Sequence, residues 1–483
     1  MENGSPPAQH VDVLIVGAGL SGVGAAWRLK ERCPGKSWLI LEGRNRIGGT
    51  WDLFRYPGIR SDSDIFTLGF PFRPWPSDRA IVDGPSIRDY VEDTARESGI
   101  FNRIRFGHQV KNASWSSADA RWTVETDAQT FTCAFLYLCT GYYDFAAGYR
   151  PIWPSEEDFQ GRIVHPQFWP YDLDYSGKRI AVIGSGATAV TLIPAMAVTA
   201  AHVTMVQRSP TYIVSRPARD RIAAALQKIL PAPAAHFLTR WKNVLLTIYV
   251  YGRSRKNPKK VADWIVDQAG RQLPAGYPVT RDFRPSYNPW DQRLCLVPDG
   301  DLFTAIRGGN VSIATGAIDR FTPAGIRLTG GEEIPADIIV TATGLNLKLA
   351  GGISLMVDGA RVTLADRTLY KGMMLNGVPN LAISVGYINA SWTLRSDITA
   401  RAVCRLLNHL DGRGLAVATP RDDPSPERRP LLELSSGYLA RAEGLLPRQG
   451  LAHPWRVRQN YVRDLVAMTF SRTSEALDFR KAG

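Results

Sequence analysis

Cysteines are few in this sequence, and they are scattered. Five occur in 483 residues, with no close pair of the kind that binds a metal or carries out redox exchange. They are Cys33, Cys133, Cys139, Cys295 and Cys404. An odd and sparse set argues against a disulfide scaffold and fits a reducing compartment.

Long apolar runs are also missing. No stretch approaches the ~20 apolar residues of a membrane-spanning helix. Residues 243–250 are the most apolar part of a basic region, but they are far too few. The first ten residues, MENGSPPAQH, lack the basic start and apolar centre of a signal peptide. We therefore expect a cytoplasmic protein.

Positive charge is in excess, with 58 Lys and Arg against 45 Asp and Glu, a net charge of +13. Such an excess suits nucleic acid, an anionic membrane or small anionic ligands. No nucleic-acid-binding motif is visible, so we favour phosphate-containing cofactors and expect no nucleic-acid partner. Many basic residues lie within 216–285, which leaves a weak peripheral membrane contact open. The sequence does not predict the oligomeric state.

Two glycine-rich turns each follow an apolar run. The first, Gly17-Ala18-Gly19-Leu20-Ser21-Gly22, comes after residues 11–16 and precedes a helix-compatible segment. The next apolar run, residues 37–41, ends in Glu42. In the Rossmann motif a carboxylate at this strand end accepts hydrogen bonds from a ribose diol. This turn predicts a site for an adenine dinucleotide without a 2′-phosphate.

The second turn, Gly184-Ser185-Gly186-Ala187-Thr188-Ala189, follows residues 179–183. Its next strand, residues 202–206, is followed by Gln207, Arg208 and Ser209. A guanidinium at this position suits a 2′-phosphate, which a carboxylate would repel. Ala189 replaces the third glycine, a variant that close helix packing permits. The two turns together indicate FAD and NADP, and hence a flavoenzyme.

These motifs predict an α/β fold with two Rossmann-like dinucleotide-binding domains. We expect the FAD-binding domain to comprise residues 1–145 and 345–483, including a C-terminal segment. We expect residues 146–178 to connect it to an NADP-binding domain, 179–344. Prolines and basic residues within 216–285 indicate a helical insertion in the second domain.

Two further constellations stay ambiguous when only their residues are considered. In Gly49 to Asp62, the aromatic side chains could cover a core, and Asp62 could cap a helix. In Phe159 to Pro170, His165 could be a hydrogen-bonded residue of a connecting segment rather than a catalyst. Spacing alone does not decide between these structural roles and functional ones.

Both constellations resemble signatures of the Baeyer–Villiger monooxygenases. Residues 159–170 match F-x-G-x-x-x-H-x-x-x-W-P through Phe159, Gly161, His165 and Trp169, and residues 49–62 match G-x-W-x-x-x-x-Y-P-G-x-x-x-D. Further stretches resemble a mycobacterial branch of that family across nearly the whole chain. They are GGTWDLFRYPGIRSDSD, GSGATAVTLIPA, QRSPTYIVS, YNPWDQRLCLVPDGDLF, PADIIVTATGLNL and NASWTL.

The resemblance implies an enzyme that binds FAD and uses NADPH and O₂. In that family the reduced flavin adds O₂ to form a C4a-peroxyflavin, which converts ketones to esters or lactones. The same species oxygenates sulfides and thioamides at sulfur. The expected partners of this chain are therefore O₂ and a small ketone or sulfide.

The resemblance also assigns roles to individual residues. Arg293 would be the active-site arginine, whose permanent charge suits a developing oxyanion, and Asp62 would orient it. His165 and Trp169 would couple the domains rather than catalyse. The FAD residues would be Gly17, Gly19, Ser21, Gly22, Glu42, Gly49, Thr50, Trp51, Asp52, Leu53, Asp62 and Val110. The NADP residues would be Arg60, Ser61, Asp62, Gly184, Ser185, Gly186, Ala187, Thr188, Ala189, Val190, Arg208 and Ser209. No metal site is expected.

One position departs from the wider family. Many members have lysine directly before the active-site arginine, whereas this chain has Gln292. The preference for NADPH would then depend more on Arg208, and the sequence leaves its strength open.

Three alternatives share some of these features. A plain flavin monooxygenase or N-hydroxylase has both nucleotide-binding folds, although Trp169 favours the Baeyer–Villiger branch. A disulfide reductase also pairs FAD with NADPH, but it needs two close cysteines, which this sequence lacks. A basic membrane- or nucleic-acid-associated protein that merely binds flavin is the third.

Overall fold

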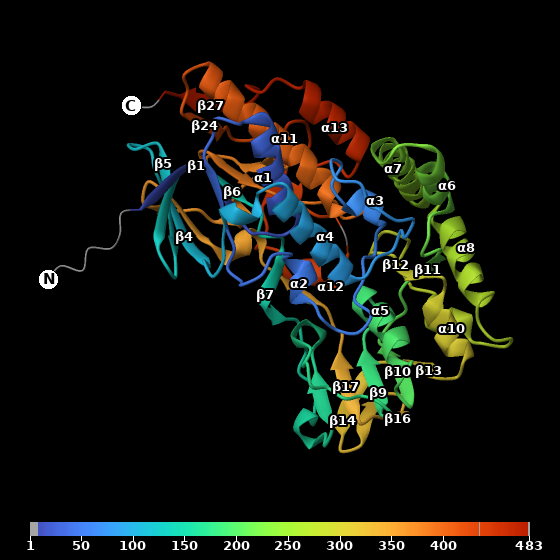
Figure 1. The fold of residues 1–483 in the computed structure, drawn as a ribbon. Coiled ribbons are helices and arrows are strands. Elements are labelled where there is room, and N and C mark those ends of the chain that lie inside the picture. Colours follow the sequence, from blue (N-terminus) through green and yellow to red (C-terminus); the bar gives the residue numbers. More distant parts are fainter. Residues whose placement is uncertain (1–7, 434, 482–483) are drawn as a thin grey trace.

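Two sheets organise the chain in this computed structural model, which describes residues 8–433 and 435–481. The prediction that no signal peptide is present depends partly on residues 1–7, which lie outside the described residues. Figure 1 shows the first sheet in the upper part of the molecule and the second sheet below it. The prediction of an α/β fold with two Rossmann-like units is confirmed.

The first sheet has nine strands within the described residues, in the order β20-β19-β4-β5-β6-β1-β2-β3, with β23 also paired to β6. Its strands are β1 (Gln9–Val16), β2 (Trp38–Leu41), β3 (Ile104–Arg105), β4 (Val110–Ser116), β5 (Arg121–Thr126), β6 (Thr130–Leu138), β19 (Ser354–Val357), β20 (Ala360–Arg361) and β23 (Leu381–Ile383). Its helices are α1 (Leu20–Arg32), α2 (Thr50–Leu53), α3 (Ile65–Leu68), α4 (Gly84–Glu97) and α11 (Trp392–Gly412). The chain returns to this sheet through β19, β20 and β23.

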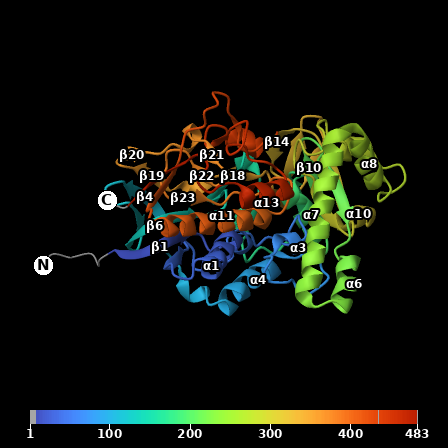
Figure 2. The same cartoon turned by 90° about the horizontal axis from the view of Figure 1, so that it is seen from above.

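Strand β1 is apolar throughout its centre because the sheet is covered on both faces. Val13 and Ile15 pack into the core that contains α1 and α11, whereas Leu14 and Val16 pack into the core on the other face. Successive side chains of a strand point to opposite faces, so an interior strand needs apolar residues at every position. Figure 2 shows α1 and α11 lying side by side along one face.

The second sheet has the order β13-β10-β9-β17-β8, and all its pairs are parallel. Its strands are β8 (Arg162–Val164), β9 (Arg179–Ile183), β10 (His202–Gln207), β13 (Val311–Thr315) and β17 (Ile338–Thr341). Helices α5 (Ala187–Met196) and α10 (Asp301–Arg307) pack in this unit, and a three-stranded sheet extends it through β14 (Ile318–Thr322), β15 (Gly325–Leu328) and β16 (Glu333–Pro335).

Residues 146–178 contain more structure than a plain connection. Strand β8 lies in this segment and pairs with β17, with Ile163 opposite Ile339 and buried Val164 opposite Val340. The apolar residues of β8 are buried only by joining the edge of the second sheet. The expected connection is therefore partly a piece of the second unit.

The insertion 216–285 is helical, as predicted. It comprises α6 (Arg221–Ile229), α7 (Ala232–Lys256), α8 (Pro258–Gly270) and α9 (Val279–Phe283). Helices α6, α7 and α8 form one outer edge of the molecule in Figures 1 and 2. Among the described residues, no helix combines the length and apolarity required to cross a membrane.

Short elements complete the fold. The two-stranded pairs are β7 (Tyr143–Gly148) with β18 (Leu345–Leu347), β11 (Ile213–Arg216) with β12 (Cys295–Pro298), β21 (Leu369–Tyr370) with β22 (Met374–Leu375), β24 (Val417–Pro420) with β27 (Leu477–Arg480), and β25 (Arg429–Pro430) with β26 (Arg448–Gln449). The C-terminal helices are α12 (Gly437–Arg441) and α13 (Tyr461–Phe470).

A buried ion pair joins α13 to α11. The Arg395 guanidinium contacts the Asp464 carboxylate and also donates to the carbonyl oxygen of Lys371 at 3.0 Å. Tyr387 donates its hydroxyl to the same carboxylate at 2.8 Å. These contacts attach the C-terminal segment to the first unit.

Replacing this arginine by alanine is expected to destabilise the protein by about 3–5 kcal/mol, because it leaves the buried Asp464 without its cation. Urea unfolding measures the change for Arg395→Ala. Arg121→Ala, which removes an exposed ion pair with Asp119, is expected to change stability by less than about 1 kcal/mol. Equal effects of the two substitutions would contradict the proposed role of Arg395.

Candidate functional site

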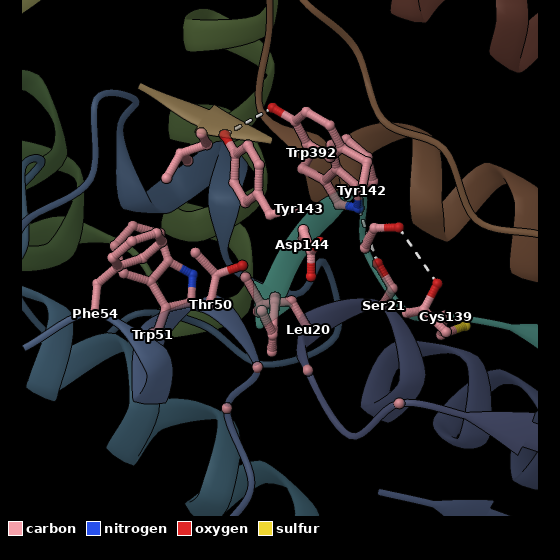
Figure 3. A pocket seen from close by; sticks show the side chains of 18 of the residues that line it. Leu20, Ser21, Thr50, Trp51, Phe54, Cys139, Tyr142, Tyr143, Asp144 and Trp392 are labelled. Carbon is pink, nitrogen blue, oxygen red and sulfur yellow. Dashed lines mark hydrogen bonds between the residues drawn. The ribbon is translucent and has the colours of Figure 1, made fainter. Parts of the chain in front are cut away.

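A cavity of about 470 Å³ lies at the carboxyl ends of the central strands of the first sheet and extends to helix α5 of the second unit. Its walls come from the first glycine turn, the loop around α2, the segment after β6, and the loop that carries Arg293. Figure 3 shows several of the side chains that line it. Strand ends of parallel sheets are the usual position for ligands in α/β proteins.

The first glycine turn brings α1 very close to β6. Gly17 has a φ of +105°, and a Cβ at this position would lie 2.6 Å from the carbonyl oxygen of Cys139. A Cβ on Gly22 would lie 1.8 Å from the carbonyl oxygen of Gly17. Helix α1 begins after Gly19 without a side-chain cap, so its first amide groups are available to an anionic ligand. This cradle fits the pyrophosphate of a dinucleotide.

Glu42 lines the same cavity at the end of β2. Its Oε2 accepts a hydrogen bond from the amide of Ala18 at 2.8 Å, and its Oε1 accepts one from the amide of Arg44 at 3.0 Å. Burial raises the pKa of this carboxyl group, whereas the two amides oppose that shift. Each oxygen has a second lone pair, so a carboxylate oriented in this way still suits a ribose diol.

Aromatic side chains from distant segments form another wall. Trp392 donates its indole N–H to the hydroxyl of Ser21 at 2.9 Å and stacks on Tyr142 with ring centroids 4.7 Å apart. The hydroxyl groups of Tyr142 and Tyr143 are hydrogen-bonded at 2.8 Å (Figure 3). None of these three side chains was among the predicted site residues. The signal for Tyr142 and Tyr143 was the tight turn at Thr140-Gly141, directly after β6, and Trp392 lies in the stretch NASWTL.

Asp62 and Arg293 meet in this cavity. Arg293 Nη1 lies 3.4 Å from Asp62 Oδ2, and its Nε donates to the carbonyl oxygen of Ile388 at 3.4 Å. Desolvation lowers the pKa of this guanidinium. The opposing effects of Asp62 and of the neighbouring phenol groups are larger, so the net pKa is well above its ordinary value. Arg293 is therefore a permanent cation. Asp64, not Asp62, caps α3, since its side chain accepts from the amide of Thr67.

The second glycine turn repeats the geometry of the first. Gly184 has a φ of +133°, and a Cβ there would lie 2.3 Å from the carbonyl oxygen of Ala342, which follows β17. Helix α5 begins after Gly186 without a side-chain cap. Arg208 is exposed at the carboxyl end of β10. The turn and this cation fit the phosphates of a second dinucleotide.

The predicted cofactor and catalytic residues divide into those that line the cavity and those that do not. The former are Gly17, Gly19, Ser21, Glu42, Gly49, Thr50, Trp51, Arg60, Ser61, Asp62, Val110, Ala187, Thr188 and Arg293. The latter are Gly22, Asp52, Leu53, Gly184, Ser185, Gly186, Ala189, Val190, Arg208 and Ser209.

Several predicted side chains have other partners. The carboxylate of Asp52 is buried against Arg44 and Arg55, at 2.6 and 3.1 Å, so it faces away from the cavity. Ala189 and Val190 are fully buried in the core of the second unit, where they pack rather than bind. Arg60 lies at the cavity but pairs with Asp301 at 2.5 Å.

The Phe159–Pro170 signature supports the junction between the units. His165 Nδ1 accepts from the amide of Gln167 at 3.2 Å, and burial lowers the pKa of this imidazole, so the ring is neutral at pH 7. A Cβ on Gly148, at the end of β7, would lie 2.0 Å from the His165 ring. These contacts connect the segment that carries His165 to the end of β7, and a role in coupling the units stays a prediction.

The other signature residues also pack. Phe159 lies edge-on to Phe321 with ring centroids 6.4 Å apart, and a Cβ on Gly161 would lie 2.3 Å from the carbonyl oxygen of Asp337. Trp169 packs on the core of the second unit.

Comparison with known proteins defines the class. Residues 15–76 match an NAD(P)-binding Rossmann-like domain, and residues 68–409 match the flavin-binding monooxygenase-like family. The chain therefore belongs to the flavin-binding monooxygenase-like family.

One member of this family is similar to the chain over nearly its whole length. The chain is 55% identical over 463 residues, or 95% of each sequence, to the FAD-containing monooxygenase EthA of Mycobacterium tuberculosis. Two solved structures share the fold. One is an oxidised steroid monooxygenase bound to NADP, at 23% identity and a TM-score of 0.76, and the other is cyclohexanone monooxygenase, at 19% identity and a TM-score of 0.74. Each alignment covers 98% of this chain and 100% of the other.

The first glycine turn provides a direct test of the flavin site. Gly22→Ala is expected to remove bound flavin from the purified protein, because the added methyl group collides with the carbonyl oxygen of Gly17. Flavin absorbance per mole of protein measures the effect. Gly35→Ala, where a Cβ has open space, is the matched control and should keep its flavin. Full flavin content in a folded Gly22→Ala variant would disprove the assignment.

Proposed function

We propose that this protein is an FAD-dependent, NADPH- and O₂-using Baeyer–Villiger monooxygenase. It converts ketones to esters or lactones and oxygenates sulfides or thioamides at sulfur. The observation that carries the proposal is the Asp62–Arg293 pair, which lies in a cavity lined by the first glycine turn and by α5. A permanent cation in this cavity supports a site where a dinucleotide cofactor and a small substrate meet.

The two glycine turns hold the cofactors in this proposal. The first turn and Glu42 bind the pyrophosphate and adenosine ribose of FAD, and the second turn with Arg208 binds NADPH. Bound flavin supplies the transfer of hydride and the activation of O₂, which protein side chains cannot provide. The relatives support both cofactors, since EthA of Mycobacterium tuberculosis is an FAD-containing monooxygenase and the steroid monooxygenase was solved bound to NADP.

Arg293 stabilises negative charge on the substrate oxygen. A guanidinium has five N–H groups, and the described contacts with Asp62 and Ile388 engage two of them. Asp62 holds the group in place before the reaction, so little reorganisation is needed when charge develops. The aromatic side chains of Tyr142, Tyr143 and Trp392 line the same cavity, so a cofactor and a substrate bound against them would leave less room for water near this charge, which would strengthen the interaction.

Product analysis separates this proposal from an N-hydroxylase. Purified protein, supplied with NADPH and O₂, is offered a panel of ketones, sulfides and amines, and products are identified by mass spectrometry. Esters from ketones support the proposal. N-oxygenated amines without any ester would overturn it.

Arg293→Ala is expected to keep bound FAD and NADPH-driven flavin reduction but to lower product formation by about 10²–10³-fold, as when an oxyanion-stabilising donor is lost. Stopped-flow absorbance measures the reduction, and chromatography measures the product. Arg255→Ala removes an exposed cation paired with Asp291 and should behave as wild type. Unchanged ester formation in Arg293→Ala would remove Arg293 from its role.

Arg208→Ala is expected to raise KM for NADPH about tenfold while KM for NADH changes little, because only NADPH has the 2′-phosphate. Steady-state kinetics with both coenzymes provides the measurement. Arg216→Ala, at another exposed strand end, is the control. If the two coenzymes are affected equally, Arg208 does not bind the 2′-phosphate.

A further inference from the structure

Helix α7 exposes a stripe of large apolar side chains. Leu238, Leu245, Leu246 and Tyr249 are 46%, 55%, 44% and 66% exposed. They follow one another at spacings of seven, one and three residues, which places them on one side of an α-helix. On the neighbouring helices, Ile229 of α6 and Trp264 of α8 are also exposed. Figure 2 shows α8 and α6 beside opposite ends of α7 at the edge of the molecule.

The opposite side of α7 is firmly attached to the first unit. Arg240 is buried and donates to the carbonyl oxygens of Phe66 and Gly69 at 2.7 and 2.8 Å. Asn243 donates to the carboxylate of Asp64 at 2.9 Å, and Val244 packs in a small core with Tyr387 and Leu394. These contacts fix the orientation of the helix, so the apolar stripe on its other side faces outward.

A helix with apolar residues on both sides is normally buried on both sides. Exposed apolar groups gathered on one element mark an interaction surface more often than scattered ones do. The centre of α7 has such groups on its outer side as well as on its packed side. The stripe is thus expected to have a partner.

Charge around the stripe identifies the kind of partner. Helix α7 contains no Asp or Glu, and Arg253 and Lys256 continue the exposed side beyond Tyr249. Lys259 and Lys260 follow at the start of α8 and are exposed. Residues 220–271 contain ten Lys and Arg but three Asp and no Glu. The apolar stripe therefore ends in a cluster of cations.

The geometry points to an anionic lipid bilayer as the partner of this surface. Helix α7, roughly 37 Å long at 1.5 Å per residue, would lie along the bilayer, with Leu238, Leu245 and Tyr249 among the acyl chains. Arg253 and Lys256 would contact lipid phosphates. Apolar side chains of an interfacial helix enter the acyl region, whereas its cations contact the anionic headgroups above that region. A second copy of this chain fits less well, since a symmetric contact would place two copies of α7, each with basic but no acidic side chains, against each other.

Vesicle co-sedimentation of the whole flavin-loaded protein tests the inference. The probes are phosphatidylcholine vesicles with and without phosphatidylglycerol. Wild type should bind the anionic vesicles at least tenfold more tightly, and added salt should weaken the binding. Leu245→Ser with Tyr249→Ser, and separately Arg253→Glu with Lys256→Glu, should each reduce binding at least tenfold while ketone oxygenation in solution stays unchanged.

Matched double variants control for general loss of apolar surface or charge. Ile152→Ser with Val198→Ser removes exposed apolar groups elsewhere, and Lys111→Glu with Arg413→Glu reverses exposed charges elsewhere. Both should bind vesicles like wild type. Equal loss in these controls, or no preference for anionic lipid, would overturn the inference. It would also be overturned if light scattering showed a dimer that Leu245→Ser with Tyr249→Ser dissociates, since a second copy would then cover the stripe.

Discussion

The site depends on the close approach of helix and strand at two glycine turns. At Gly17 and Gly184 the backbone takes a positive φ, and a Cβ would collide with the carbonyl group that follows a neighbouring parallel strand. This contact places the uncapped start of α1 and of α5 at the carboxyl edge of its sheet. Both proposed phosphate-binding surfaces, and the cavity that extends from the first turn to α5, follow from that constraint.

The Asp62–Arg293 pair depends on this arrangement. Asp62 lies in the loop before α3, whereas Arg293 precedes β12, more than two hundred residues later. They meet because the first unit and the loop that carries Arg293 share one cavity wall. The guanidinium keeps its charge at any working pH, and the Asp62 carboxylate favours that charge despite desolvation. The family assignment agrees with the fold, while the reaction itself stands as a proposal.

Much of the fold was predictable because the pattern is local. Apolar runs around the two glycine turns predicted β1, β2, β9 and β10 to within about two residues, and the insertion with its prolines and basic residues was correctly expected to be helical. The segment 146–178 was harder to interpret. Its strand β8 has only three residues. These residues form a strand because they pair with the edge of β17, and no local sequence pattern predicts that pairing.

The sequence by itself determined the class of ligand, because glycine spacing, Glu42 and Arg208 are local features whose chemistry is direct. It also marked Asp62 and Arg293, though only through resemblance. Tertiary structure alone decided that Trp392 and Tyr142 stack beside Ser21, that Asp52 faces arginines instead of the cavity, and that Asp64 takes the capping role. The tertiary structure was also needed to show that the apolar side of α7 is exposed. Such contacts join residues far apart in the chain, so their partners are set by packing and not by sequence spacing.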